Sequence, residues 1–60
     1  MSDNEIKVMD SIRRAGIPVQ PDDVARDTGL DMRQVFKIIN ELKRKGRITS
    51  PRRCYYTLAE

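Results

Sequence analysis

The side chains best suited to chemistry in this sequence are cations and amides that recur between residues 33 and 44. Four of them follow one another at intervals of three or four residues: Arg33, Lys37, Asn40 and Arg44. On a helix this spacing places them within roughly 60° of one another. Arginine and lysine donate to guanine O6 and N7 or to phosphate oxygens, whereas asparagine and glutamine pair with adenine N6 and N7. The stripe, with Gln34 at its edge, therefore predicts base and phosphate recognition.

The opposite side of the same segment is apolar, and it predicts how the stripe is positioned. Met32, Val35, Ile39 and Leu42 cluster there, with Phe36 and Ile38 at the margins. A helix that buries this side must present the cations to solvent. The alternative interpretation is that the charged side is only a solvated surface, as on many amphipathic helices.

Charge is divided unevenly along the chain. The net charge is +3, from 12 Lys and Arg against 9 Asp and Glu. Residues 1–30 carry four cations and six anions, which gives −2, whereas residues 31–60 carry eight cations and three anions, which gives +5. A basic half of a small domain is typical of proteins that bind a polyanion.

Composition argues against several other classes of protein. The chain has no histidine, which removes the commonest general base, and its single cysteine, Cys54, excludes an intrachain disulfide. No set of metal ligands and no base–nucleophile pair can be assembled, so we expect neither an enzyme nor a cofactor. The longest apolar runs are too short to cross a membrane. These features predict a reducing compartment, the cytoplasm, with nucleoid association if the source is prokaryotic.

Capping and turn residues divide the chain into five elements. Ser2 and Glu5 form a capping box that predicts a first helix from about Asp3 to Ala15. A brief extended segment at 17–19 precedes a second helix that begins at Pro21 and ends at Thr28-Gly29. A third helix is expected over 32–45, with Asp31 as its N-cap and Gly46 as its stop. The β-favouring runs 47–50 and 54–58 then predict a hairpin.

The hairpin contributes the second group of cations. Its expected tip, residues 50–53, contains Arg52 and Arg53, which could reach a flanking phosphate or the minor groove. A solubilising turn is the other interpretation. Alternation along the last strand assigns Cys54, Tyr56 and Leu58 to the core. Cys54 is therefore expected to be a small buried side chain.

Two capped helices separated by about three residues around Gly29 have the spacing of a helix-turn-helix. With the flanking elements, residues 3 to 58 resemble the winged helix-turn-helix domain. The resemblance is carried by the segments PDDVA and TGL, the helix from Val35 to Leu42, and KGRI with YYTL. The run LKRKGRI followed by YYTL is similar to archaeal transcription regulators and to the C-terminal winged helix of archaeal minichromosome maintenance helicases. We thus expect one domain over 1–60, α+β but mainly α, with three helices and a short β-hairpin wing.

The resemblance implies binding of double-stranded DNA by the third helix and the wing, and it maps this role onto Arg33, Lys37, Asn40, Arg44, Arg52 and Arg53. A small transcription regulator is the leading expectation, although the wing is very short. A single module buries little area, so a homodimer through the first helix, near Ile6, is a second expectation. The alternative function is a protein-interaction module in a replication, transcription or RNA-processing assembly. It would dock a protein partner through Asp22, Asp23 and Asp27 or through the third helix.

Overall fold

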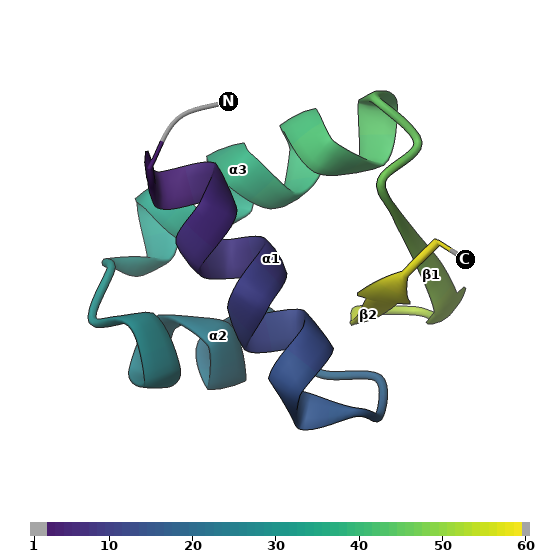
Figure 1. Cartoon of the computed structure of the whole chain (residues 1–60), viewed down its shortest axis with the longest axis horizontal. Coiled ribbons are helices and arrows are strands. Elements are labelled where there is room, and N and C mark those ends of the chain that lie inside the picture. The colour runs from purple at the N-terminus through teal and green to yellow at the C-terminus, as the bar shows by residue number, and fades with distance from the viewer. Residues whose placement is uncertain (1–2, 60) are drawn as a thin grey trace.

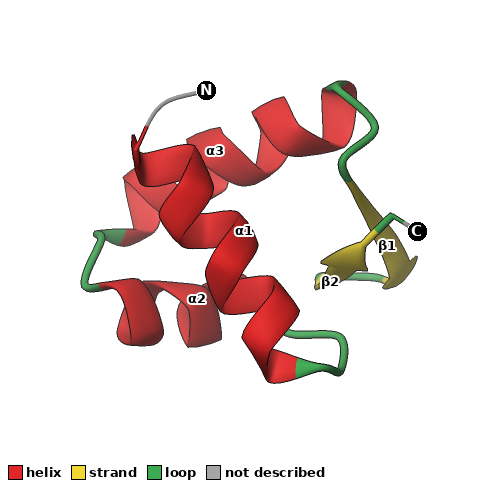
Figure 2. Cartoon of the chain, in the orientation of Figure 1, coloured by secondary structure: helices red, strands yellow, loops and turns green. Residues whose placement is uncertain are grey.

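The computed structural model describes residues 3–59, which form three helices followed by a two-stranded hairpin (Figure 1). The elements in chain order are α1 (Asp3–Ala15), α2 (Pro21–Thr28), α3 (Met32–Arg44), β1 (Ile48–Arg52) and β2 (Tyr55–Leu58). In Figure 2, α1 crosses α3, α2 lies at the lower left, and the hairpin lies on the side opposite the α2–α3 turn. This is the mainly helical, winged-helix-like α+β fold that the sequence predicts.

Local signals set the ends of the two helices that form the helix-turn-helix. Pro21 occupies the first turn of α2, and the Gln20 backbone N–H donates to the Asp23 carboxylate at 3.1 Å. Gly29 ends α2 in the left-handed region at φ 79°. Asp31 then caps α3 by accepting a hydrogen bond from the Gln34 N–H at 2.8 Å. The expected boundaries between the two helices are confirmed.

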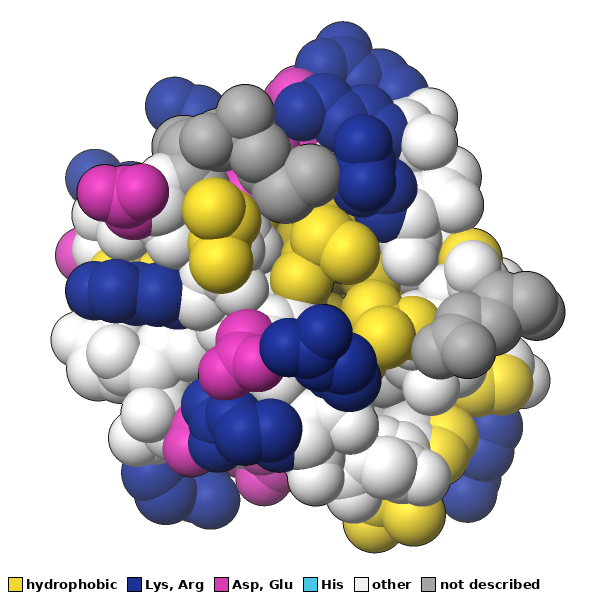
Figure 3. Space-filling view, in the orientation of Figure 1, with side chains coloured by type: hydrophobic (Ala, Val, Ile, Leu, Met, Phe, Trp, Pro, Cys, Tyr) yellow, Lys and Arg dark blue, Asp and Glu magenta, His cyan; other side chains and the backbone are white. Residues whose placement is uncertain are grey.

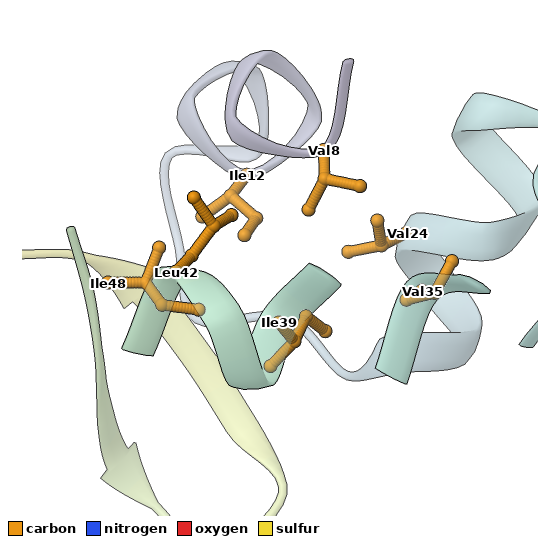
Figure 4. Close-up of a cluster of buried hydrophobic side chains, with 7 residues drawn as sticks. All are labelled: Val8, Ile12, Val24, Val35, Ile39, Leu42 and Ile48. Atoms are coloured by element: carbon orange, nitrogen blue, oxygen red, sulfur yellow. The ribbon is translucent and has the colours of Figure 1, made fainter. Parts of the chain in front are cut away.

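The core is one cluster to which every helix and β1 contribute. Its side chains point toward one another between the elements (Figure 4) and are at most 3% exposed: Val8, Ile12, Val24, Val35, Ile39, Leu42 and Ile48. Tyr56 and Leu58 of β2 are half-buried and pack against this cluster. The core therefore fixes α3 by one side only and leaves its opposite side uncovered.

The hairpin is tied to the connection between α1 and α2. β1 and β2 are antiparallel, with Ile48 opposite Leu58 and Arg52 opposite Tyr55. Tyr56 also exchanges two backbone hydrogen bonds with Val19, at 2.8 and 2.9 Å. The extended segment expected at 17–19 thus supplies one bridging residue, which places β2 between Val19 and β1.

The turn of the hairpin differs from the sequence prediction. β1 continues through Pro51 to Arg52, so the turn is Arg53-Cys54 and not residues 51–53. The strand register shifts between Thr49 and Arg52, which lets Pro51 stay in the strand although it has no N–H to donate. The shift moves Cys54 out of the alternating pattern into the turn, where it is exposed with φ 67°. The prediction of a buried Cys54 was wrong.

Two further expectations about local structure have different outcomes. Met32, in the first turn of α3, does not join the core and is 39% exposed. The capping residue Ser2 lies outside the described residues. Its expected partner Glu5 is buried and bonds Lys45 at the far end of α3, with 3.1 Å between Oε2 and Nζ.

No helix within residues 3–59 combines the length and apolarity needed to cross a bilayer.

Candidate nucleic-acid interface

The outer face of α3 is defined here by the four residues Arg33, Lys37, Asn40 and Arg44. All four are exposed, whereas Val35, Ile39 and Leu42 on the other side of the helix are fully buried. Gln34, also exposed, lies at the border of this face. α3 has 13 residues and is therefore about 20 Å long, and a bare helix of this size can enter the major groove of B-DNA.

Ion pairing divides the cations of the outer face into two groups. Arg44 pairs with Glu41 of its own helix, so part of its charge is compensated. Arg33 and Lys37 have no acidic partner within 4.0 Å in the part of the chain that the structure describes. The uncompensated positive charge of the outer face therefore lies in the N-terminal half of α3. In a helix-turn-helix this half of the second helix makes most of the base contacts.

Both ends of α3 are held firmly, which fixes the direction of its outer face. Asp31 caps the N-terminus, as described above. At the C-terminus Gly46, with φ 76°, closes a Schellman turn in which the Arg47 N–H donates to the Leu42 carbonyl at 2.9 Å. The Lys45–Glu5 ion pair joins this end to the first turn of α1. Figure 3 shows Lys and Arg side chains gathered over the C-terminal end of α3.

The wing supplies one free and one engaged arginine. The Arg52 guanidinium lies 4.9 Å from the centroid of the Tyr55 ring, in a cation–π contact that aligns the two side chains across the hairpin. Arg53 is exposed in the turn, and no ion pair to it is found within residues 3–59. The Tyr55 ring is half-buried and is covered on one side by Arg52. Both arginines thus lie near the end of the hairpin, but only Arg53 is unengaged.

The acidic residues of α1 and α2 are matched by arginines. Arg14 bridges the two helices, with 2.8 Å to both Asp10 and Asp27, and Arg13 adds a bond to Asp10 at 2.6 Å. Hydrogen bonds from Arg14 and Arg13 lower the pKa of Asp10 below its usual value, and those from Ser11 and Arg14 do the same for Asp27. The contacts with both carboxylates raise the pKa of Arg14.

The two acids at the start of α2 are also paired. Arg26 lies 3.7 Å from Asp22 and 3.4 Å from Asp23. The three aspartates that could attract a cationic partner are therefore each within reach of an arginine of this chain. This side of the molecule presents alternating charges and not a continuous anionic surface.

Two side chains that the sequence assigned to the apolar side of α3 lie beside its outer face. Phe36 is 47% exposed, and Met32 lies one turn before it on the same side of α3. Neither belongs to the core or to the half-buried side chains that pack on it. The sequence contained a usable signal, because Phe36 falls about 90° from the centre of the buried side, next to Asn40.

A shallow apolar groove lies on α1, away from the outer face of α3. It has a volume of about 360 Å³, and its apolar lining consists of Ile6, Met9 and Leu58. Lys7, Asp10 and Arg13 form its charged rim. Hydrophobic side chains bordered by charged ones are visible in the middle of this face in Figure 3. Of the three apolar side chains that line the groove, Ile6 is the most exposed, at 52%.

Among residues 3–59 no three His, Cys, Asp or Glu side chains come together in a way that could hold a metal ion. No family model matches the chain, and no curated protein or solved structure matches it.

Proposed function

We propose that this protein binds double-stranded DNA with α3 in the major groove and acts as a small transcription regulator. The observation that carries the proposal is the outer face of α3, where Arg33 and Lys37 are exposed and unpaired among the described residues, beside the amide of Asn40. In the winged-helix-like fold this helix is the second of the helix-turn-helix pair, and that is the helix that reads the groove. We also propose that the chain belongs to the winged helix-turn-helix family.

The residues divide by the contacts that they are proposed to make. Arg33, Gln34, Lys37 and Asn40 lie near base edges, and Arg44 lies near the phosphates at the end of the groove. Arg52 and Arg53 reach a neighbouring phosphate from the wing, where the Arg52 guanidinium also lies over the Tyr55 ring. If about four phosphates are neutralised, the logarithm of the binding constant falls with the logarithm of salt concentration with a slope near −3.6. Raising salt from about 50 to 200 mM then weakens binding on the order of a hundredfold.

The first test is an NMR titration of labelled protein with a duplex of about 16 base pairs at low and moderate salt. Amide shifts should concentrate at 31–45 and 50–54 and fade as salt rises. Shifts confined to α1 and α2, or binding that is independent of salt, would exclude this use of α3.

A pair of single variants separates the outer face from charge in general. Lys37→Ala removes an unpaired cation from α3, whereas Arg26→Ala removes a cation that pairs within α2. Both lower the net charge equally. We expect Lys37→Ala to weaken binding about fivefold to tenfold and to reduce the salt slope by about 1, because one phosphate or base contact is lost. Arg26→Ala should bind as the wild type does, and equal losses in the two variants would contradict the proposal.

A second copy of the chain is the proposed partner on DNA. Two modules one helical turn apart give the area that a single small domain lacks. The groove on α1 offers Ile6, Met9 and Leu58 for this contact, with cations and an acid at its rim. Sedimentation of the protein with and without duplex tests it, since a strict monomer at tens of micromolar and one copy per duplex would exclude the dimer.

The alternative function is a protein-interaction module in a replication, transcription or RNA-processing assembly. Pairing of Asp22, Asp23 and Asp27 with arginines leaves this alternative to the exposed face of α3. Comparison of Lys37→Ala with Arg26→Ala distinguishes the two, because nonspecific attraction of a basic docking module to DNA falls equally in both variants, whereas binding through α3 falls only in Lys37→Ala.

A further inference from the structure

The apolar strip on α3, formed by Met32 and Phe36, is continuous with the outer face. Phe36 lies three residues after Arg33 and four before Asn40, and residues at these intervals are neighbours on a helix surface. Phe36 therefore lies along the edge of the outer face, beside the two residues best suited to read guanine and adenine. Phe36 is 47% exposed at this edge, where the outer face would meet its ligand.

The major groove offers few apolar features to such a ring. Each base pair presents donors and acceptors there, and the C5-methyl group of thymine is the apolar exception. Phenylalanine makes that contact in protein–DNA interfaces because burying the methyl group removes apolar surface of both partners from water. The charges around Phe36 favour a nucleic acid as the occupant over an apolar protein surface, since Arg33 and Lys37 would both have to be desolvated against a protein.

We propose that Phe36 determines sequence preference by packing against a thymine methyl group, next to the base pair that Asn40 or Arg33 reads. This inference rests on the proposed function. The preferred DNA sequence then contains at least one thymine that is recognised by its methyl group and not by its hydrogen-bonding pattern. Met32 borders the same methyl group from the first turn of α3.

The test replaces thymine by deoxyuracil, which keeps every hydrogen bond and removes only the methyl group. A preferred duplex is first selected with the wild-type protein from a random pool. Each thymine is then changed in turn to deoxyuracil, and affinity is measured by fluorescence anisotropy at fixed salt. Burial of one methyl group predicts a loss of about fourfold at one position. The Phe36→Ala variant should bind both duplexes equally, because the partner of the methyl group is gone.

Ile17→Ala is the matched control, since it truncates an exposed apolar side chain in the connection between α1 and α2. It should keep the full preference for thymine. Circular dichroism is used to check that Phe36→Ala is folded. We expect a folded variant because the Phe36 side chain is half exposed. Salt-dependent binding with no effect of deoxyuracil at any position, or an undiminished effect in Phe36→Ala, overturns this inference and leaves the proposed function standing. Absence of duplex binding by the wild type overturns both.

Discussion

Cys54 holds the hairpin turn in a backbone conformation that few side chains tolerate. With Arg53 it forms the two-residue connection between β1 and β2, and its φ of 67° lies in the left-handed region, where a Cβ approaches the neighbouring carbonyl. Turns that require a positive φ at the second central position usually have Gly or Asn there. The cysteine is thus a strained residue of the wing and contributes nothing to the core.

Replacing Cys54 by glycine should stabilise the protein. Relief of the left-handed strain outweighs the added freedom of the unfolded chain and leaves a gain of about 1 kcal/mol. For a domain of this size the gain raises the melting temperature by roughly 4–8 °C. Thermal unfolding followed by circular dichroism under reducing conditions measures it. Arg53→Gly is the control, since Arg53 has no positive φ and gains nothing from glycine; equal effects at the two positions would contradict the explanation.

At the scale of elements, α1 and α2 are joined on their exposed side by one arginine. Arg14 bonds Asp10 on its own helix and Asp27 on the other. Its hydrogen bond is the main cause of the lowered pKa of Asp10, and at Asp27 it adds to the larger effect of Ser11. A carboxyl whose pKa is lower in the folded than in the unfolded chain stabilises the fold above the unfolded pKa. That stabilisation is lost as pH falls through the folded value.

The pH dependence of stability should therefore show this network. The urea midpoint of the wild type is expected to fall as the pH is lowered below about 4, because the unfolded chain there binds protons at Asp10 and Asp27 more readily than the folded chain does. Arg14→Met should have a lower midpoint at pH 7 and a shallower fall in acid, because the two carboxyls then titrate nearer their usual values. Arg26→Met is the control, since Arg26 pairs only within α2. A wild-type acid profile in Arg14→Met would show that the bridge contributes no stability.

Elements whose signals are local could be predicted from the sequence, and those set by distant contacts could not. Pro21, Asp31 and Gly46 each determine a helix end by chemistry within a few residues, and those ends were predicted. The position of the turn at Arg53-Cys54 depends on a shift in strand register that no residue type in the hairpin predicts. The exposed face of α3 followed from its periodicity, but the pairing of Arg44 with Glu41 and the exposure of Phe36 depend on rotamers and on what other elements leave uncovered.

At the scale of the whole molecule, stability depends on the cluster of seven buried hydrophobic side chains found within residues 3–59, in a domain that measures 24 × 21 × 19 Å. Domains of about this size have only about 3–5 kcal/mol of net stability from a single core. The loss of one large side chain from the cluster is comparable with that total. Substitutions on α3 should consequently divide sharply by the side of the helix on which they fall.

Two truncations in α3 test this division. Ile39 is fully buried, so Ile39→Ala should cost about 2–5 kcal/mol and leave much of the protein unfolded at 25 °C. Phe36→Ala removes a larger side chain from the exposed side and should change the free energy of unfolding by less than about 1 kcal/mol. Urea unfolding at 25 °C measures both. A larger loss for Phe36→Ala than for Ile39→Ala would mean that the ring supports the fold.

The bridge between Val19 and Tyr56 also bears on how the protein behaves in concentrated solution. Because β2 lies between Val19 and β1, the sheet has two open edges, and each carries a proline: Pro18 beside the bridge and Pro51 within β1. A strand edge that lacks an N–H is a poor template for another chain. The sheet is thereby protected against growth by the addition of a strand from another copy of the chain.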